Sequence, residues 1–188
     1  YGLNALATNF FLDQMVVDAV PSRIDKRIVF MGKWKRPDNF DGLKWFFDNV
    51  YDKISKDLTI SIVGKWLPEQ FEEKLKKLNN VEYLGFVENP YDMIANSMAT
   101  ISPLFSGAGV KVKVVESLAC GTPVIGNDIA FEGIADTYRK FMLHADTPEE
   151  YAKLIQEMAI SIESRQLYKR MFMENYVKQS IVNFVENY

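Results

Sequence analysis

Short apolar runs alternate along the chain with segments in which apolar residues recur at helical spacing. The runs, which are typical of buried parallel strands, cover Ile28–Met31, Leu58–Val63, Val81–Leu84, Ala99–Leu104, Pro123–Gly126 and Phe141–Leu143. The segments with helical spacing cover Phe40–Ile54, Pro68–Leu78, Pro90–Asn96, Lys111–Ala119, Pro148–Ile162 and Ser164–Tyr188. This alternation predicts an α/β fold of the doubly wound class, with a parallel sheet of about six strands flanked by helices.

The composition is that of an ordinary globular domain. Net charge is −3 over 188 residues, and no apolar run approaches the roughly 18–20 residues of a membrane span. The small basic clusters Lys33–Arg36 and Lys111–Lys113 suit one or two phosphates better than a duplex. We therefore expect no nucleic-acid partner and no membrane span. One histidine, His144, and one cysteine, Cys120, cannot form a zinc site, and no metal is expected.

The segment Ser106–Pro123 carries the strongest chemical signal. Gly107 and Gly109 follow a predicted strand and precede the helix predicted over Lys111–Ala119. Glycine lets the backbone turn tightly and approach a ligand closely. The first turn of a helix offers free N–H groups and a positive dipole end to an anion. The segment predicts a nucleotide-diphosphate site, although a plain tight turn would also explain both glycines.

Charged residues within this predicted helix fit the same interpretation. Lys111 and Lys113 stand in the first turn, where cations oppose the helix dipole unless an anion is bound. Glu116 lies further along, and a carboxylate can accept two hydrogen bonds from vicinal ribose hydroxyls. The alternative for Glu116 is an ordinary solvated helix residue.

A small repeat, Gly-Lys-Trp, follows the first two predicted strands at Gly32–Trp34 and Gly64–Trp66. We favour the interpretation that both glycines close tight turns, and the alternative puts Lys33 at the ligand crevice. All three tryptophans are interpreted as packing residues, with Trp34 the best candidate for an exception. Cys120 is expected to be a small packed helix residue, and His144 a polar residue at a strand end.

At this point the sequence resembles a known family. Residues Gly107–Gly126, G-A-G-V-K-V-K-V-V-E-S-L-A-C-G-T-P-V-I-G, followed by Glu132–Ile134, resemble the donor-binding signature of GT-B fold glycosyltransferases, glycosyl transferases group 1. The most similar group is that of glycogen-synthase-like retaining enzymes. Phe30–Gly32 with Pro37–Asn39 resembles the first strand and following loop of that group, and Asn80–Val87 resembles its third strand. The resemblance covers roughly residues 27–160.

The resemblance implies that the chain is the Rossmann-like, donor-binding half of a GT-B fold. It would bind a UDP- or GDP-sugar, without a cofactor, and transfer the sugar with retention. Glu116 would hold the ribose, Gly107–Val110 would meet the diphosphate and sugar, and Lys33 and Lys111 would stabilise the leaving phosphates. The implied donor-binding residues are Gly32, Lys33, Gly85, Phe86, Val87, Gly107, Ala108, Gly109, Val110, Lys111, Lys113 and Glu116.

Two departures qualify this resemblance. The family often has two glutamates separated by seven residues, and here Ala108 stands at the first position while Glu116 occupies the second. The usual contact of the first glutamate with the donor sugar is therefore absent or supplied differently. The chain also has no D-x-D motif, which favours a metal-independent transferase.

The resemblance also implies a domain organisation. Residues 1–26 would be the end of a preceding domain or a connection to it, 27–162 the nucleotide-sugar-binding domain, and 163–188 a helix that packs back toward a missing N-terminal domain. The chain starts at Tyr1 rather than Met, so we expect a piece of a longer protein that is inactive alone. The missing domain would bind an acceptor glycan or lipid-linked sugar.

We expect a cytoplasmic location, or a peripheral one at the inner membrane surface. Two other functions stay open at this point. One is a sugar-nucleotide epimerase of the same fold, which would need further acid and base residues. The other is a non-catalytic nucleotide-binding module, which Ala108 leaves possible.

Overall fold

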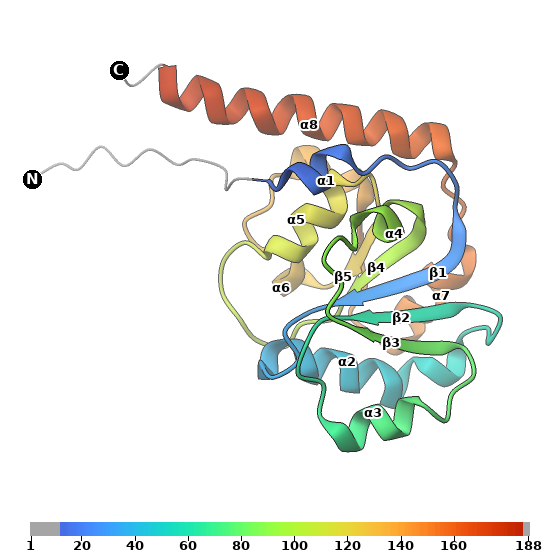
Figure 1. The fold of residues 1–188 in the computed structure, drawn as a ribbon. Coiled ribbons are helices and arrows are strands. Elements are labelled where there is room, and N and C mark those ends of the chain that lie inside the picture. The colour runs from blue at the N-terminus through green and yellow to red at the C-terminus, as the bar shows by residue number, and fades with distance from the viewer. Residues whose placement is uncertain (1–11, 186–188) are drawn as a thin grey trace, which may run out of the picture.

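Six parallel strands form one sheet with helices on both faces (Figure 1). The computed structural model describes residues 12–185, with side chains as far as Tyr176. Within them the strands are β1 (Asp25–Met31), β2 (Thr59–Val63), β3 (Val81–Gly85), β4 (Ser97–Ser102), β5 (Val124–Gly126) and β6 (Met142–His144), in the spatial order β3-β2-β1-β4-β5-β6. The predicted α/β class and the six-stranded parallel sheet are confirmed.

The helices form a layer on each side of this sheet. They are α1 (Gln14–Asp18), α2 (Pro37–Asn49), α3 (Glu69–Leu75), α4 (Tyr91–Asn96), α5 (Val112–Ala119), α6 (Asp128–Phe131), α7 (Pro148–Glu157) and α8 (Ile162–Val185), with 3-10 turns η1 (Tyr51–Lys53) and η2 (Asp136–Phe141). One layer contains α2, α3 and α7, and the other contains α1, α4, α5 and α8 (Figure 1).

The apolar runs of the strands allow helices to bury both faces of the sheet. In β1, Ile28 and Phe30 belong to the apolar cluster under α2, whereas Val29 belongs to the cluster under α5. Successive side chains of a strand point to opposite faces, so a continuous apolar run is what a strand covered on both sides requires. No helix within the described residues is long and apolar enough to cross a membrane.

Several predicted boundaries were wrong, and two short elements were not predicted. β4 ends at Ser102 rather than Leu104. Pro103 has no N–H for the ladder, and its carbonyl oxygen lies only 1.8 Å from where a Cβ on Gly42 would stand, so the chain turns against α2. Residues 128–131 and 136–140, which were not assigned, lie in α6 and η2, and Phe141, predicted to start the sixth strand, ends η2. α7 starts at Pro148 behind the Thr147 cap, as predicted, but ends at Glu157.

The predicted terminal helices fall only partly within the described residues. Apolar residues of Ala5–Asp18 also recur at spacings that could be helical, and the described part of this segment contains α1, which starts at Gln14. Residues 1–11 and 186–188 lie outside the described residues. The helix predicted over Ser164–Tyr188 is confirmed as α8 between Ile162 and Val185.

Two buried cations attach α8 to the rest of the domain. The Arg165 guanidinium, in a residue only 1% exposed, donates to the carbonyl oxygens of Ala95, Ser97 and Met98. Lys169 Nζ donates to the carbonyl oxygens of Val16 and Ala119, both at 3.1 Å. Burial lowers the pKa of Arg165 to about 10. The carbonyls of Ala95 and Ala119 belong to the last turns of α4 and α5, where cations are favoured.

We expect Arg165→Met to lower the free energy of unfolding by about 2 kcal/mol, because buried carbonyl groups lose their hydrogen-bond donor. Urea denaturation followed by circular dichroism would measure the loss. Arg170→Met is the matched control, since Arg170 lies on the same helix and is exposed. Equal stability of the two variants would contradict the anchoring role of Arg165.

Candidate functional site

Glycines at the ends of β1, β2 and β3 bring three backbone segments together at one edge of the sheet. The amide of Gly32 donates to Val63 O at 3.1 Å, and the amide of Gly64 donates to Gly85 O at 2.7 Å. A Cβ on Gly64, whose φ is +125°, would lie 1.7 Å from Gly32 O. The close approach of the Gly32 carbonyl therefore explains the glycine at position 64, and both glycines hydrogen-bond to the end of the neighbouring strand.

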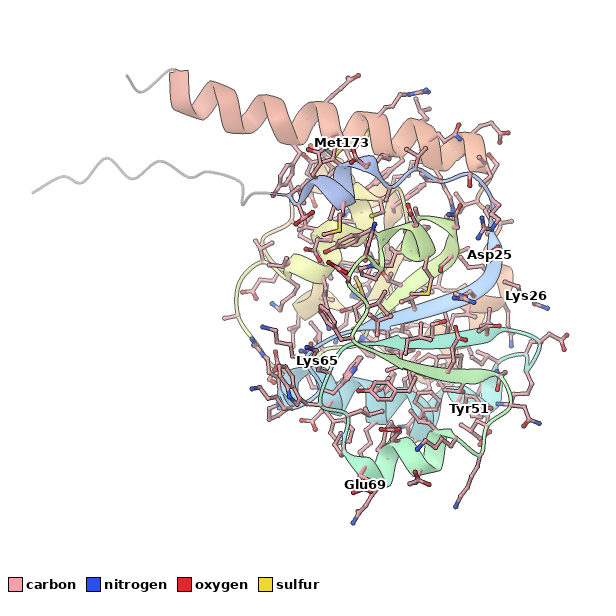
Figure 2. The ribbon with its side chains drawn as sticks, in the orientation of Figure 1. Asp25, Lys26, Tyr51, Lys65, Glu69 and Met173 are labelled. Atoms are coloured by element: carbon pink, nitrogen blue, oxygen red, sulfur yellow. The ribbon has the colours of Figure 1, made fainter. Side chains whose placement is uncertain are left out.

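The tryptophans of these segments differ from each other. Trp34 is 2% exposed and belongs to the core cluster, so it is not available to stack on a ligand. Trp66 is 51% exposed with a φ of +68°, which corrects its interpretation as a packing residue. Lys35 Nζ lies 4.3 Å from the centroid of the Trp66 ring. Lys33 is exposed, and Figure 2 shows Lys65 at the same edge, opposite to Asp25 and Lys26.

The segment 106–110, here named the glycine loop, is exposed and leads directly into α5. Gly107 has a φ of +107° and Gly109 one of +73°, conformations that L side chains rarely adopt. A Cβ on Gly109 would meet nothing within 4 Å. Lys111 is the N-cap residue of α5, and no side chain accepts a hydrogen bond from the first turn. The helix therefore starts with amide groups that no capping side chain satisfies.

Lys111 holds the glycine loop to the segment Glu132–Ile134. Its Nζ donates to Gly109 O and lies 3.2 Å from Glu132 Oε2. A Cβ on Gly133 would lie 2.8 Å from Val110 Cγ2, so the two segments are also in close contact. The Lys111 ammonium is thus already paired with a carboxylate.

Lys113 links α5 to the start of α2. Its Nζ donates to Asn39 Oδ1 at 2.8 Å. The neighbouring Asp38 is paired with Arg36, whose hydrogen bonds hold the pKa of the Asp38 carboxyl below its usual range. Burial lowers the pKa of Lys113 to about 8. The loop after β1 and the helix after β4 therefore share a cluster of charged side chains.

Glu116 is only partly exposed and lies one turn beyond Lys113. Burial raises the pKa of its carboxyl group, while a hydrogen bond from the Tyr91 side chain opposes that shift. A solvated surface glutamate would not show this burial. Tyr91 is the first residue of α4 and was not predicted to be part of the site; the sequence carries no motif that would have identified it.

Gly85, Phe86 and Val87 follow β3 at the same edge of the sheet. Gly85 has a φ of +62° and open space where a Cβ would be. Phe86 is 64% exposed, and Lys65 Nζ lies 4.2 Å from its ring centroid. Val87 is partly buried against the cluster under α5. The structure therefore brings the loops after β1, β3 and β4 to one edge, as predicted, while Ala108 contributes only a methyl group.

Two further residues that the sequence singled out, Cys120 and His144, have surroundings that match their predicted roles. Cys120 is fully buried, as expected, and burial raises the pKa of its thiol to about 12. His144 ends β6 as a polar residue, as expected, with Nε2 3.0 Å from Asp128 Oδ1. Among the described residues no group of three His, Cys, Asp or Glu side chains could hold a metal ion.

Comparison with known sequences gives one family. The family model described as "Glycosyl transferases group 1" matches residues 25–160. The chain is also 24% identical over 139 residues to an uncharacterised 44.6 kDa protein in the cps region of Klebsiella pneumoniae. That alignment covers 68% of this chain and 36% of the Klebsiella protein, so the chain spans about a third of that relative.

Solved structures with a similar fold include three that cover most of this chain. Anabaena Alr3699/HepE in complex with UDP has a TM-score of 0.65 at 16% identity, over 93% of this chain and 51% of that one. TarM has a TM-score of 0.69 at 16% identity, over 91% and 36%. AviGT4, a glycosyltransferase involved in avilamycin A biosynthesis, has a TM-score of 0.56 at 20% identity, over 85% and 52%. These similarities show the fold.

We expect the free energy of unfolding of Glu116→Gln to be larger than that of the wild type at pH 7. Because the folded-state pKa of Glu116 is raised, the folded protein holds its proton more tightly than the unfolded chain, and its ionisation above that pKa costs stability. The difference should vanish below about pH 4, where the carboxyl is protonated in both states. Urea denaturation at both pH values would measure it.

Glu149→Gln is the matched control for that experiment. A hydrogen bond from Lys53 lowers the pKa of this exposed carboxyl group, so its removal should not stabilise the protein at pH 7. A Glu116→Gln variant that is less stable than the wild type at pH 7 would show that burial of the carboxylate is not costly.

Proposed function

The chain belongs to the glycosyl transferases group 1 family and has the fold of one half of a GT-B enzyme, and from this premise we propose that residues 27–162 bind a nucleotide-diphosphate sugar as the donor for glycosyl transfer. The observation that carries the proposal is the start of α5. Its first-turn amides have no capping side chain, they follow an exposed glycine loop, and they lie beside the point where the strand order reverses. Ligands of doubly wound folds bind at this point.

In this proposal the diphosphate binds to the amides of the glycine loop and of the first turn of α5. Partial positive charge at the helix start favours a dianion there. The same groups would stabilise the charge that develops as the nucleoside diphosphate leaves the sugar. Anabaena Alr3699/HepE, which has this fold, was solved in complex with UDP, and this supports a nucleoside diphosphate as the ligand class.

Glu116 is proposed to accept hydrogen bonds from the ribose hydroxyls. Its carboxylate lies on α5, beyond the amides assigned to the diphosphate, and it is partly buried rather than solvated. Gly85, Phe86 and Val87 are proposed to contact the base, because they end β3 at the same edge and Phe86 exposes its ring.

The two lysines proposed as phosphate ligands now differ in their roles. Lys33 is exposed and forms no ion pair with another described residue, so its ammonium is free to reach a phosphate of the donor. Lys111 is paired with Glu132 and donates to Gly109 O. We propose that Lys111 mainly fixes the glycine loop. Transfer is proposed to be retaining, as the resemblance to glycogen-synthase-like enzymes implies, and independent of metal, since cations of the chain would balance the leaving group.

The same edge of the sheet is proposed to face the acceptor-binding domain. Exposed apolar side chains follow the ends of several strands there, in the loops and at the start of α5; they are Trp66, Phe86, Phe105, Val110 and Val112. Apolar surface of this kind marks a contact with another domain or a ligand. Residues 1–26 and 163–188 would connect to that domain, which would bind a glycan or lipid-linked sugar. The isolated chain would bind the donor without transferring it, in the cytoplasm or at the inner membrane surface.

Non-catalytic nucleotide binding is the second candidate, and Ala108 favours it. A methyl group cannot hydrogen-bond the donor sugar, so nucleotide affinity without sugar transfer is compatible with the loop. A full-length protein that binds the nucleotide but transfers no sugar from any donor would establish this candidate.

We expect the wild type to bind UDP or GDP and to prefer the ribonucleotide to its 2′-deoxy form by about tenfold, the effect of one hydrogen bond to a charged group. Glu116→Gln should weaken binding and reduce that preference, because the charged acceptor is lost. Isothermal titration calorimetry with each nucleotide pair would measure both quantities.

Glu163→Gln serves as the control, since Glu163 is exposed on α8. An undiminished preference for the ribonucleotide in Glu116→Gln would contradict the ribose assignment. No binding of either ribonucleotide by the wild type would contradict the proposed function itself.

A further inference from the structure

Lys113 lies at the junction of the glycine loop, α2 and the centre of the sheet. Its Nζ donates to Asn39 Oδ1 at 2.8 Å. A Cβ on Gly107 would lie 3.9 Å from Asp38 Oδ2 and 3.7 Å from Lys111 Cε. The glycine loop therefore covers the charged cluster to which Lys113 belongs.

A small cavity of about 10 Å³ lies beside Lys113, between α5 and the ends of β1 and β4. It is lined in part by Thr100 and Ser102 of β4. These residues are 4% and 3% exposed, and neither hydroxyl has a hydrogen-bond partner within the described residues. Buried hydroxyls are nearly always paired, so this cavity offers polar groups that the protein itself leaves unused.

Hydroxyl groups suit a lysine that changes its charge. An ammonium can only donate hydrogen bonds, whereas a neutral amine also needs a donor for its lone pair. A hydroxyl can accept from the first and donate to the second. Thr100 and Ser102 line the cavity beside Lys113 without a hydrogen bond to its amine, so their hydroxyls are available to either protonation state.

The charged groups around Lys113 leave it without a carboxylate of its own. Asp38 and Arg36 face it from the start of α2, and Lys111 faces it from the glycine loop. Asp38 is already bound by Arg36 at 2.9 Å and 3.1 Å, while Lys111 is paired with Glu132. Burial and the two neighbouring cations lower the pKa of Lys113, to about 8, against the opposing effect of Asp38.

We propose that Lys113 supplies the positive charge that meets the donor diphosphate beside the glycine loop, and that its amine takes up a proton from solvent as the diphosphate binds. The inference rests on the proposed function. The only bond that forms is N–H on Nζ, and the proton comes from the buffer. Nucleotide binding at alkaline pH is therefore linked to protonation of one side chain.

Proton uptake on nucleotide binding should occur only at pH values where Lys113 is partly unprotonated in the free protein. At about pH 6.5 Lys113 is already protonated in the free protein and takes up no proton, while the terminal phosphate of the nucleotide, whose pKa is about 6, releases a fraction of a proton when the ionised form binds. At pH 8 about half of the free protein is unprotonated, and binding of a dianion should take up about half a proton. Between pH 7 and pH 9 the Kd of UDP should rise by about tenfold.

The test is isothermal titration of the full chain with UDP and GDP at pH 6.5 and 8, each in two buffers of different ionisation enthalpy. The dependence of the observed heat on the buffer gives the number of protons taken up. Lys113→Arg should bind without uptake at pH 8, since arginine is protonated throughout. Lys113→Met should bind at least tenfold more weakly than wild type at pH 7, with a Kd independent of pH between 7 and 9.

Lys65→Arg is the control, because Lys65 lies at the same edge outside this cluster, and it should keep the wild-type uptake. Uptake in the wild type and in Lys65→Arg, with none in either Lys113 variant, would support the inference. Nucleotide binding without uptake in the wild type, or uptake that persists in the Lys113 variants, would overturn it and leave donor binding intact. Absence of UDP and GDP binding would overturn the proposed function as well.

Discussion

The parallel pairing of β1 with β4 is the constraint on which the candidate site depends. These two strands lie side by side at the middle of the sheet, with Val29 opposite Thr100. The chain moves outward from them in opposite directions, to β2 and β3 on one side and to β5 and β6 on the other. The strand order therefore reverses between the loops after β1 and β4, the position at which doubly wound folds bind ligands. Contacts such as Lys113 with Asn39 join residues 74 positions apart between these loops.

The first-turn amides of α5 can face a ligand because hydrogen bonds fix the C-terminal end of this helix. Lys169 donates to Ala119 O at the last residue of the helix. Directly beyond, the Thr122 hydroxyl donates to Ile94 O at 2.8 Å, which ties the Gly-Thr-Pro turn to α4. The side chains of Val115 and Leu118 are buried. Polar groups at the end and apolar groups along one face thus fix the direction in which the amides point.

Much of the fold could be predicted from local sequence. Each of the first three strands is a short apolar run with a glycine at or next to its end, and these glycines proved to be places where backbones meet or turn. Helix α7 was recognisable from Thr147 and Pro148, which form its cap and first turn. The short elements α6 and η2 were missed, because four to six residues are too few to show a period.

The site was predictable in position but not in its side-chain partners. The order of glycines, lysines and Glu116 along the chain located the start of α5. The partners of those residues come from distant segments: Glu132 for Lys111, Asn39 for Lys113 and Tyr91 for Glu116. Lys33 is exposed whereas Lys111 is paired with Glu132. This difference depends on tertiary contacts and cannot be predicted from the spacing of residues along the sequence. Trp66 was misjudged for the same reason.

The central claim is that backbone amides at the start of α5 bind a nucleoside diphosphate. The most direct measurement is a titration of the isotopically labelled chain with UDP and GDP, followed by the backbone amide resonances. The account predicts saturable shifts that are largest for the amides from Gly107 to Lys113. Saturable binding that leaves these amides unshifted and perturbs another part of the sheet would contradict it.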